Sequence, residues 1–137
     1  MRSLRFVLMT LLVTTLALGA FASAQQVVDF WHGMTGSRLA VLEQVVDGFN
    51  ERDPNMQINP VLMGTYEEGL ARFLGAYPVG EEPPLIQIYE VGTQAMHDSG
   101  MIIPAYQIPG MLGEEWDFGQ YVGPIVRYYS RDGNLWS

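Results

Sequence analysis

The first candidate for chemistry is Glu90, a carboxylate that directly follows the apolar run Leu85–Tyr89 and precedes Gly92. A run of this kind predicts a buried strand, and burying a charge without a partner or a task is costly. The carboxyl ends of parallel strands are also where ligands bind. We therefore expect Glu90 to contact a ligand. A second role, as a carboxylate at the positive end of the following helix, is compatible with the first.

Three more side chains take the same position relative to an expected strand. Trp31 and His32 end the first apolar run, and Tyr66 follows the run Ile58–Met63 after a glycine. Tyrosine and tryptophan combine an apolar ring with a polar group, which suits stacking on a ligand or hydrogen bonding to it. We expect Tyr66, Trp31 and His32 to line a ligand site together with Glu90. Packing against a strand is the alternative for Tyr66, and Trp31 is expected to belong partly to the core.

Catalysis by these residues has less support. A general base needs a nucleophile or an orienting group within reach, and the chain has one other histidine, His97, and no cysteine. No serine stands in the glycine-flanked elbow of a hydrolase. His32, Glu90 and His97 lack the spacing of metal ligands on a helix, so we expect no metal, no cofactor and no catalytic residue. A secreted hydrolase that uses His32 and Glu90 as acid and base is the enzymatic alternative.

The glycine-rich segment 33–37 precedes an expected helix, and its backbone N–H groups could cradle an anion. It lacks the lysine of a P-loop. Nucleotide hydrolysis is therefore not expected.

The apolar spacing predicts a β-α-β-α-β order of elements around these residues. Pro60 indicates an edge strand, Ser37 is the expected N-cap of the first helix, and Thr65 with Glu68 has the spacing of a capping box before the second. Alternating strands and helices predict an α/β fold with a parallel sheet, whose strand ends share one edge. The strands are expected over 27–31, 58–63 and 85–89, and the helices over 37–53 and from 66 onward.

The second half of the chain is expected to contain shorter elements. They are a helix over 92–99 that ends at Gly100, a strand Met101–Ile103, a helix within Phe118–Tyr128 and a turn at Asp132–Asn134 before a further strand.

The first 24 residues have the pattern of a signal peptide. Arg2 and Arg5 precede the uncharged apolar stretch Phe6–Ala22, and Ala22-Ser23-Ala24 matches a signal-peptidase site. We expect cleavage near Ala24, with an uncleaved membrane anchor as the alternative. The absence of cysteine excludes disulfides and a lipid-attachment cysteine, so a periplasmic or secreted protein without a lipid anchor is expected.

The remaining residues, 25–137, could form one modest core. They carry fifteen acidic residues, five arginines and no lysine, a net charge of −10. So acidic a chain argues against nucleic acid and anionic membrane surfaces as partners.

Five short motifs resemble the amino-terminal part of the periplasmic solute-binding proteins of ABC importers. The likeness is greatest to the members of that family that bind glycerol 3-phosphate, and it covers essentially all of residues 25–137. The matching segments are FWH-x-M-x-G at 30–36, FN-x-x-x-P at 49–54, G-x-YE at 64–67, IQIYEVGT at 86–93 and YYS at 128–130.

The resemblance implies a non-enzymatic binding protein that captures glycerol 3-phosphate or a glycerophosphodiester and delivers it to a membrane permease. Tyr66 and Glu90 fall on ligand-contacting positions, where Glu90 would accept hydrogen bonds from glycerol hydroxyls. Gly33 stands where such relatives have a serine, so a hydroxyl contact from this loop is not expected. An oligosaccharide or polyol binder of the same fold, with Trp31 and Tyr66 stacked on sugar rings, is the close alternative.

The family has two lobes that close on the ligand about a hinge. By this resemblance, residues 25–137 are an incomplete part of lobe one, and the phosphate is met largely by later sequence. We expect the protein to be a monomer, and residues 25–137 alone to bind ligand poorly.

Overall fold

A computed structural model describes residues 25–137, and the predicted signal peptide lies outside this range. The helices are α2 (Ser37–Asn50), α3 (Tyr66–Ala76), α4 (Glu90–Ser99), α5 (Ile108–Leu112) and α6 (Gly123–Tyr128). The strands are β1 (Gln26–His32), β2 (Met56–Leu62), β3 (Leu85–Ile86), β4 (Ser130–Arg131) and β5 (Asn134–Leu135). Short 3₁₀ turns occur at Tyr77–Val79, Ala105–Gln107 and Phe118–Gln120. No helix in this described range is long and apolar enough to cross a membrane.

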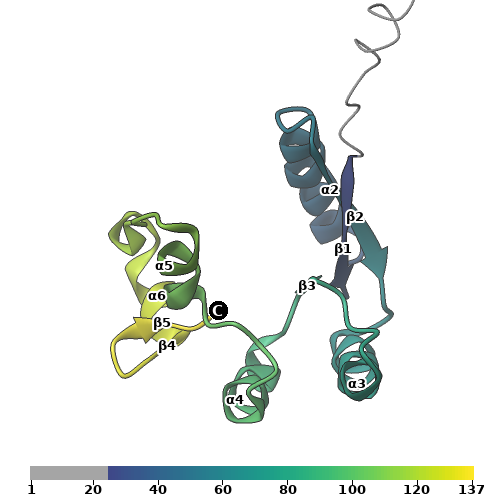
Figure 1. The fold of residues 1–137 in the computed structure, drawn as a ribbon. Helices are drawn as coiled ribbons and strands as arrows, with labels where there is room; N and C mark the ends of the chain where they lie inside the picture. Colours follow the sequence, from purple (N-terminus) through teal and green to yellow (C-terminus); the bar gives the residue numbers. More distant parts are fainter. Residues whose placement is uncertain (1–24) are drawn as a thin grey trace, which may run out of the picture.

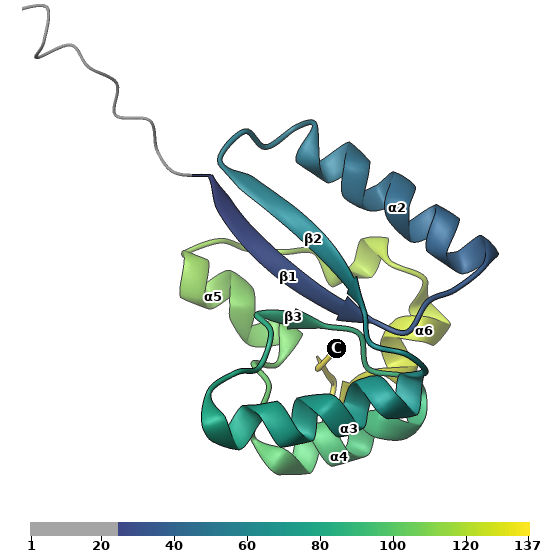
Figure 2. The same ribbon diagram turned by 90° about the vertical axis from the view of Figure 1, so that its right-hand side faces the viewer.

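The main sheet has three parallel strands in the order β2-β1-β3, which confirms the predicted α/β class. Each residue of β1 pairs with β2, from Gln26 opposite Met56 to His32 opposite Leu62. Pro60 lies in β2 at the edge of the sheet, as its missing N–H predicts. Figure 2 shows β1 and β2 side by side with α2 beside them.

The third strand is shorter than the predicted run over 85–89. Only Leu85 and Ile86 pair with β1, and one more bond follows, from the Gln87 N–H to the Trp31 carbonyl at 2.8 Å. Within residues 25–137, β3 has a partner on one side only, and Leu85 is 44% exposed. A run of apolar residues lengthens into a buried strand only where neighbours pair with it, and here the chain turns into α4 at Glu90.

Helix α2 begins one residue from the expected cap. Gly36 is the N-cap, with a φ of 60° that favours glycine, and Ser37 is the first helical residue. At the other end of α2, the side chain of Asn50 bonds to the backbone of β2 as a neighbouring strand would. Its amide donates to the Ile58 carbonyl at 3.0 Å, and its Oδ1 accepts from the Ile58 N–H at 2.8 Å. The Phe-Asn motif therefore fixes α2 to the edge strand.

Helix α3 begins with the predicted capping box. The Thr65 hydroxyl accepts from the Glu68 N–H at 3.2 Å, and the Glu68 carboxylate accepts from the Thr65 N–H at 2.7 Å. Helix α4 starts at Glu90 rather than at residue 92 and ends, as predicted, before Gly100, whose φ is 67°. In Figure 2, α3 and α4 run alongside each other below the sheet.

The second half of the chain differs from its prediction in one element. Met101–Ile103 is not a strand, because this apolar segment faces a hollow instead of a sheet neighbour. The Phe118–Tyr128 region forms a 3₁₀ turn and then α6. The predicted turn is present, and positive φ angles at Asp132 (51°) and Gly133 (80°) allow β4 and β5 to pair antiparallel.

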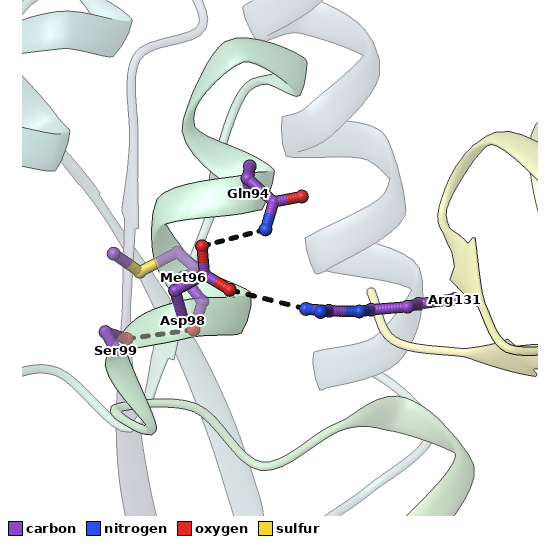
Figure 3. A network of polar contacts seen from close by, with 5 residues as sticks. All are labelled: Gln94, Met96, Asp98, Ser99 and Arg131. Atoms are coloured by element: carbon purple, nitrogen blue, oxygen red, sulfur yellow. Dashed lines mark hydrogen bonds and ion pairs between the residues drawn. The ribbon is translucent and has the colours of Figure 1, made fainter.

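Polar contacts tie this hairpin to α4 (Figure 3). Arg131 forms an ion pair with Asp98 at 3.3 Å, and Gln94 donates to the same carboxylate at 2.8 Å. The Gln94 hydrogen bond, followed by Arg131, lowers the pKa of Asp98. The His97 and Trp136 rings pack beside this pair with centroids 4.5 Å apart.

A large apolar hollow separates the sheet from the carboxyl-terminal elements. Figure 1 shows α2, β1 and β2 on one side and α5, α6, β4 and β5 on the other. The hollow has a volume of about 1000 Å³, and its lining includes Phe30, Phe73, Leu85, Ile88, Tyr129 and Trp136. The buried hydrophobic side chains that form the core of the described chain are correspondingly few: Leu42, Val46, Phe73 and Met96. Leu74 of α3 is 40% exposed.

Among residues 25–137, His32 is the one buried polar or charged side chain, with 3% of its surface exposed. Its Nδ1 accepts from the Met34 N–H at 3.2 Å, which places the proton of the neutral ring on Nε2. Burial lowers the pKa of His32, although the charge of Glu43 acts in the opposite direction. The folded state therefore favours a neutral imidazole.

Replacing Thr65 tests the capping box. Thr65→Ala removes the hydroxyl that accepts from Glu68, and we expect it to lower the free energy of unfolding by about 1 kcal/mol. Thr65→Ser keeps the hydroxyl and should recover most of that loss. Urea unfolding followed by circular dichroism measures both. Equal destabilisation by the two variants would show that the hydroxyl is not the stabilising group.

The pH dependence of the unfolding free energy tests the burial of His32. The unfolded chain takes up a proton near the ordinary histidine pKa of about 6.5, whereas the folded chain does so only at lower pH. Stability should therefore fall as pH drops below about 6.5. His32→Asn keeps an acceptor for the Met34 N–H and cannot be protonated, so its unfolding free energy should change less between pH 7.5 and 5. An unchanged pH dependence would contradict the assignment.

Candidate functional site

The candidate site is the rim, defined here by residues 31–38, 63–68 and 87–92. At this edge the three parallel strands end and the three longest helices of the described residues begin, α2 after β1, α3 after β2 and α4 after β3. Each helix start carries a partial positive charge from its unpaired N–H groups. The geometry confirms the prediction that three loops converge along one edge of the sheet.

Tyr66 is the first residue of α3, which follows the edge strand β2, and it is half-buried. The Tyr89 ring is nearly parallel to it, with centroids 6.0 Å apart and planes inclined by 18°. The Arg38 guanidinium lies over the same ring at 6.0 Å from its centroid. Residues from all three loops thus surround this tyrosine.

Glu90 is the first residue of α4 and is exposed. It is not the tip of a buried strand, as the sequence suggested, because the strand ends four residues earlier. Its carboxylate stands in the first turn of α4, where negative charge is favourable. Since Glu90 directly follows Tyr89, which stacks on Tyr66, the structure brings Tyr66 and Glu90 to neighbouring positions on the rim.

Trp31 and His32 are adjacent on β1, so their side chains point to opposite faces of the sheet. Trp31 is half-buried, and its carbonyl is bound by the Gln87 N–H. His32 is enclosed in the core, with its ring 6.0 Å from that of Phe30. A ligand contact by His32 would therefore require the loop that follows it to move.

Gln87 and Gly33 organise the rim, a role that the sequence analysis assigned to neither residue. The Gly33 N–H donates to the Gln87 Oε1 at 3.1 Å across 54 positions of sequence. A polar residue inside the apolar run Leu85–Tyr89 was the signal that could have identified Gln87. The sequence carried no such signal for Gly33, because what leaves no room for a β-carbon at this position is the nearby Tyr66 from another loop.

The exposed carboxylate of Glu90 and the phenol of Tyr66 are suited to hydrogen bonding with hydroxyl groups. Nothing in residues 25–137 assembles three or more metal-ligating side chains. In the same range no hydrogen bond joins His32 to Glu90, the pair that a hydrolase would use. The apolar hollow adjoins the rim at Gln87 and Ile88, but neither Tyr66 nor Glu90 lines it.

Sequence comparison finds relatives that match most of the chain. The chain is 36% identical over 125 residues to the sn-glycerol-3-phosphate-binding periplasmic protein UgpB of Yersinia pestis bv. Antiqua, covering 90% of this chain. It is 36% identical over 124 residues to the protein of the same name from Escherichia coli O1:K1, covering 89% of this chain. The chain spans about 28% of the length of these relatives. No protein-family model matches it.

Solved structures share the fold at lower identity. An extracellular solute-binding protein of family 1 from Alicyclobacillus acidocaldarius gives a TM-score of 0.66 at 16% identity, covering 83% of this chain and 28% of that one. The maltose/maltodextrin-binding domain MalE of Bdellovibrio bacteriovorus, bound to maltotriose, gives 0.65 at 19% identity, covering 79% and 26%. CpMnBP1 with mannotriose bound gives 0.66 at 20% identity, covering 81% and 27%.

Both the sequence relatives and the fold lead to the family that the motifs predicted: this chain corresponds to part of a periplasmic solute-binding protein of an ABC importer.

Proposed function

We propose that this chain forms the first part of the ligand-binding lobe of an importer's solute-binding protein, which captures glycerol 3-phosphate or a glycerophosphodiester. The sequence relatives carry the proposal, because proteins named for binding glycerol 3-phosphate match nine-tenths of the chain. The protein would act in the periplasm as a monomer and deliver its ligand to the membrane permease. Residues 1–24 would be the signal peptide, and residues 25–137 a partial lobe.

The rim supports this proposal at two positions. Glu90 is exposed at the start of α4, where its oxygens are free to accept hydrogen bonds from the hydroxyls of glycerol. Tyr66 is held among Gly33, Arg38 and Tyr89 and would contact the same ligand. A carboxylate suits hydroxyl groups and repels a phosphate, so the phosphate would lie away from Glu90. Trp31 and His32 complete the proposed set. His32 would act by accepting the Met34 N–H and so holding the loop that follows β1.

An oligosaccharide or polyol ligand is the second candidate. The nearly parallel pair of Tyr66 and Tyr89 offers the flat apolar surface on which sugar rings stack. Structures with the same fold contain mannotriose and maltotriose.

Calorimetry on the product of the complete natural gene tests the assignment of Glu90 and Tyr66. Losing a hydrogen bond to a charged group costs about 1.5–3 kcal/mol, so Glu90→Gln should weaken glycerol 3-phosphate binding by roughly tenfold or more. Tyr66→Ala should also weaken it. Glu115→Gln removes the same charge at an exposed position outside the rim and is the matched control. Unchanged affinity in both rim variants would refute the site.

A ligand screen on the same protein separates the two candidate ligands. We expect glycerol 3-phosphate or a glycerophosphodiester to bind, and mannotriose and maltotriose to fail to displace it. Tighter binding of an oligosaccharide, lost on Tyr66→Ala, would favour the second candidate. Turnover of a glycerophosphodiester that disappears in His32→Ala would instead establish a hydrolase.

A further inference from the structure

Charge is unevenly distributed along the rim. Its charged side chains are three carboxylates, Glu67, Glu68 and Glu90, and one cation, Arg38. The carboxylates stand in the first turns of α3 and α4, whereas the first turn of α2 holds no acidic residue and contains Arg38. Beyond residue 24 the chain has five arginines and no lysine, so positive charge is scarce in it. Arg38 therefore marks the cationic part of the rim.

The guanidinium of Arg38 lies against an aromatic ring. It is over the Tyr66 ring, 6.0 Å from the ring centroid. Among residues 25–137 no carboxylate forms an ion pair with it, unlike the guanidinium of Arg131, which binds Asp98. A guanidinium on an aromatic face keeps its N–H donors, and these match a phosphate bidentately. The donors of Arg38 are therefore available beside Tyr66.

Tyr66 has unlike neighbours from two helices. Arg38 of α2 lies over its ring, and Tyr89, which stacks on it, directly precedes Glu90 of α4. A ligand that contacts Tyr66 therefore meets a cation from α2 and a carboxylate from α4. Glycerol 3-phosphate has a matching polarity, because its phosphate is anionic and its hydroxyls donate to a carboxylate. A neutral oligosaccharide has no group that pairs with the charge of Arg38.

We infer that Arg38 binds the phosphate of the ligand and thereby selects an anionic polyol over a neutral sugar. The inference rests on the proposed function, in which Tyr66 and Glu90 contact the same ligand. Arg38 adds a contact from residues 25–137 to those that the resemblance assigns to later sequence. An exposed ion pair contributes little in water, so this contact strengthens when the lobes of the complete protein close and exclude solvent.

Calorimetry on the product of the complete natural gene tests the contact. Arg38→Gln removes the charge and should weaken glycerol 3-phosphate binding by about tenfold or more. Arg38→Lys keeps the charge but not the paired donors, so its loss should be smaller. Arg52→Gln removes the same charge just beyond the far end of α2, and this control should bind like the parent. Parent-like affinity in Arg38→Gln would overturn the inference.

Arginine modification gives a readout at Arg38 itself. The same protein is treated with phenylglyoxal, and mass spectrometry of its peptides measures the rate of reaction at each arginine. Glycerol 3-phosphate and inorganic phosphate should each slow the reaction of Arg38 several-fold and leave that of Arg52 unchanged. Sodium chloride at the same ionic strength should protect neither residue, which separates binding from screening. An Arg38 rate that neither phosphate compound changes would contradict the inference.

Failure of the inference and failure of the proposed function give different results. If the parent binds glycerol 3-phosphate and Arg38→Gln binds it equally well, the proposed function stands and the inference is wrong. If the parent does not bind glycerol 3-phosphate, the proposed function is wrong. Inorganic phosphate then decides the inference, because protection of Arg38 supports a phosphate contact at this residue and unchanged reactivity excludes one.

Discussion

The two-sided pairing of β1 is the constraint on which the rest of the structure depends. Every residue of β1 pairs with β2, and its last residues also pair with β3 and with the Gln87 N–H. Because all three strands are parallel, this pairing brings three loops and three helix starts to the same edge. Tyr66 and Glu90 are 24 positions apart in sequence and become neighbours only through β1.

Local chemistry explains the elements that were predicted correctly. Thr65 and Glu68 satisfy each other's backbone groups, Pro60 requires an edge, and Gly100 takes a positive φ. These signals act within a few residues and do not depend on distant contacts. The strand expected over 85–89 is shortened to Leu85–Ile86, and the one expected over 101–103 is absent, because an apolar run becomes a strand only where another strand lies beside it.

Part of the candidate site was predictable because it depends only on the order of strands and helices along the chain. The positions of Tyr66 and Glu90 after their strands follow from the order of elements, and the motifs named the family. The enclosure of His32 and the contact of Gly33 with Tyr66 depend on atoms brought together from different loops. Gln87 looked like part of a strand, although its side chain holds the loop after β1. Such long-range packing leaves no periodic trace in a single sequence.

The apolar hollow also has a colloidal consequence. Its lining of aliphatic and aromatic side chains is open in a chain that carries fifteen acidic residues and five arginines beyond residue 24. Like charge keeps copies of the chain apart over about 10 Å at 0.1 M salt, but over only about 3 Å at 1 M. Sulfate and similar salts also strengthen apolar association. Higher ionic strength therefore weakens the repulsion between acidic chains of this kind while it strengthens association through apolar surface.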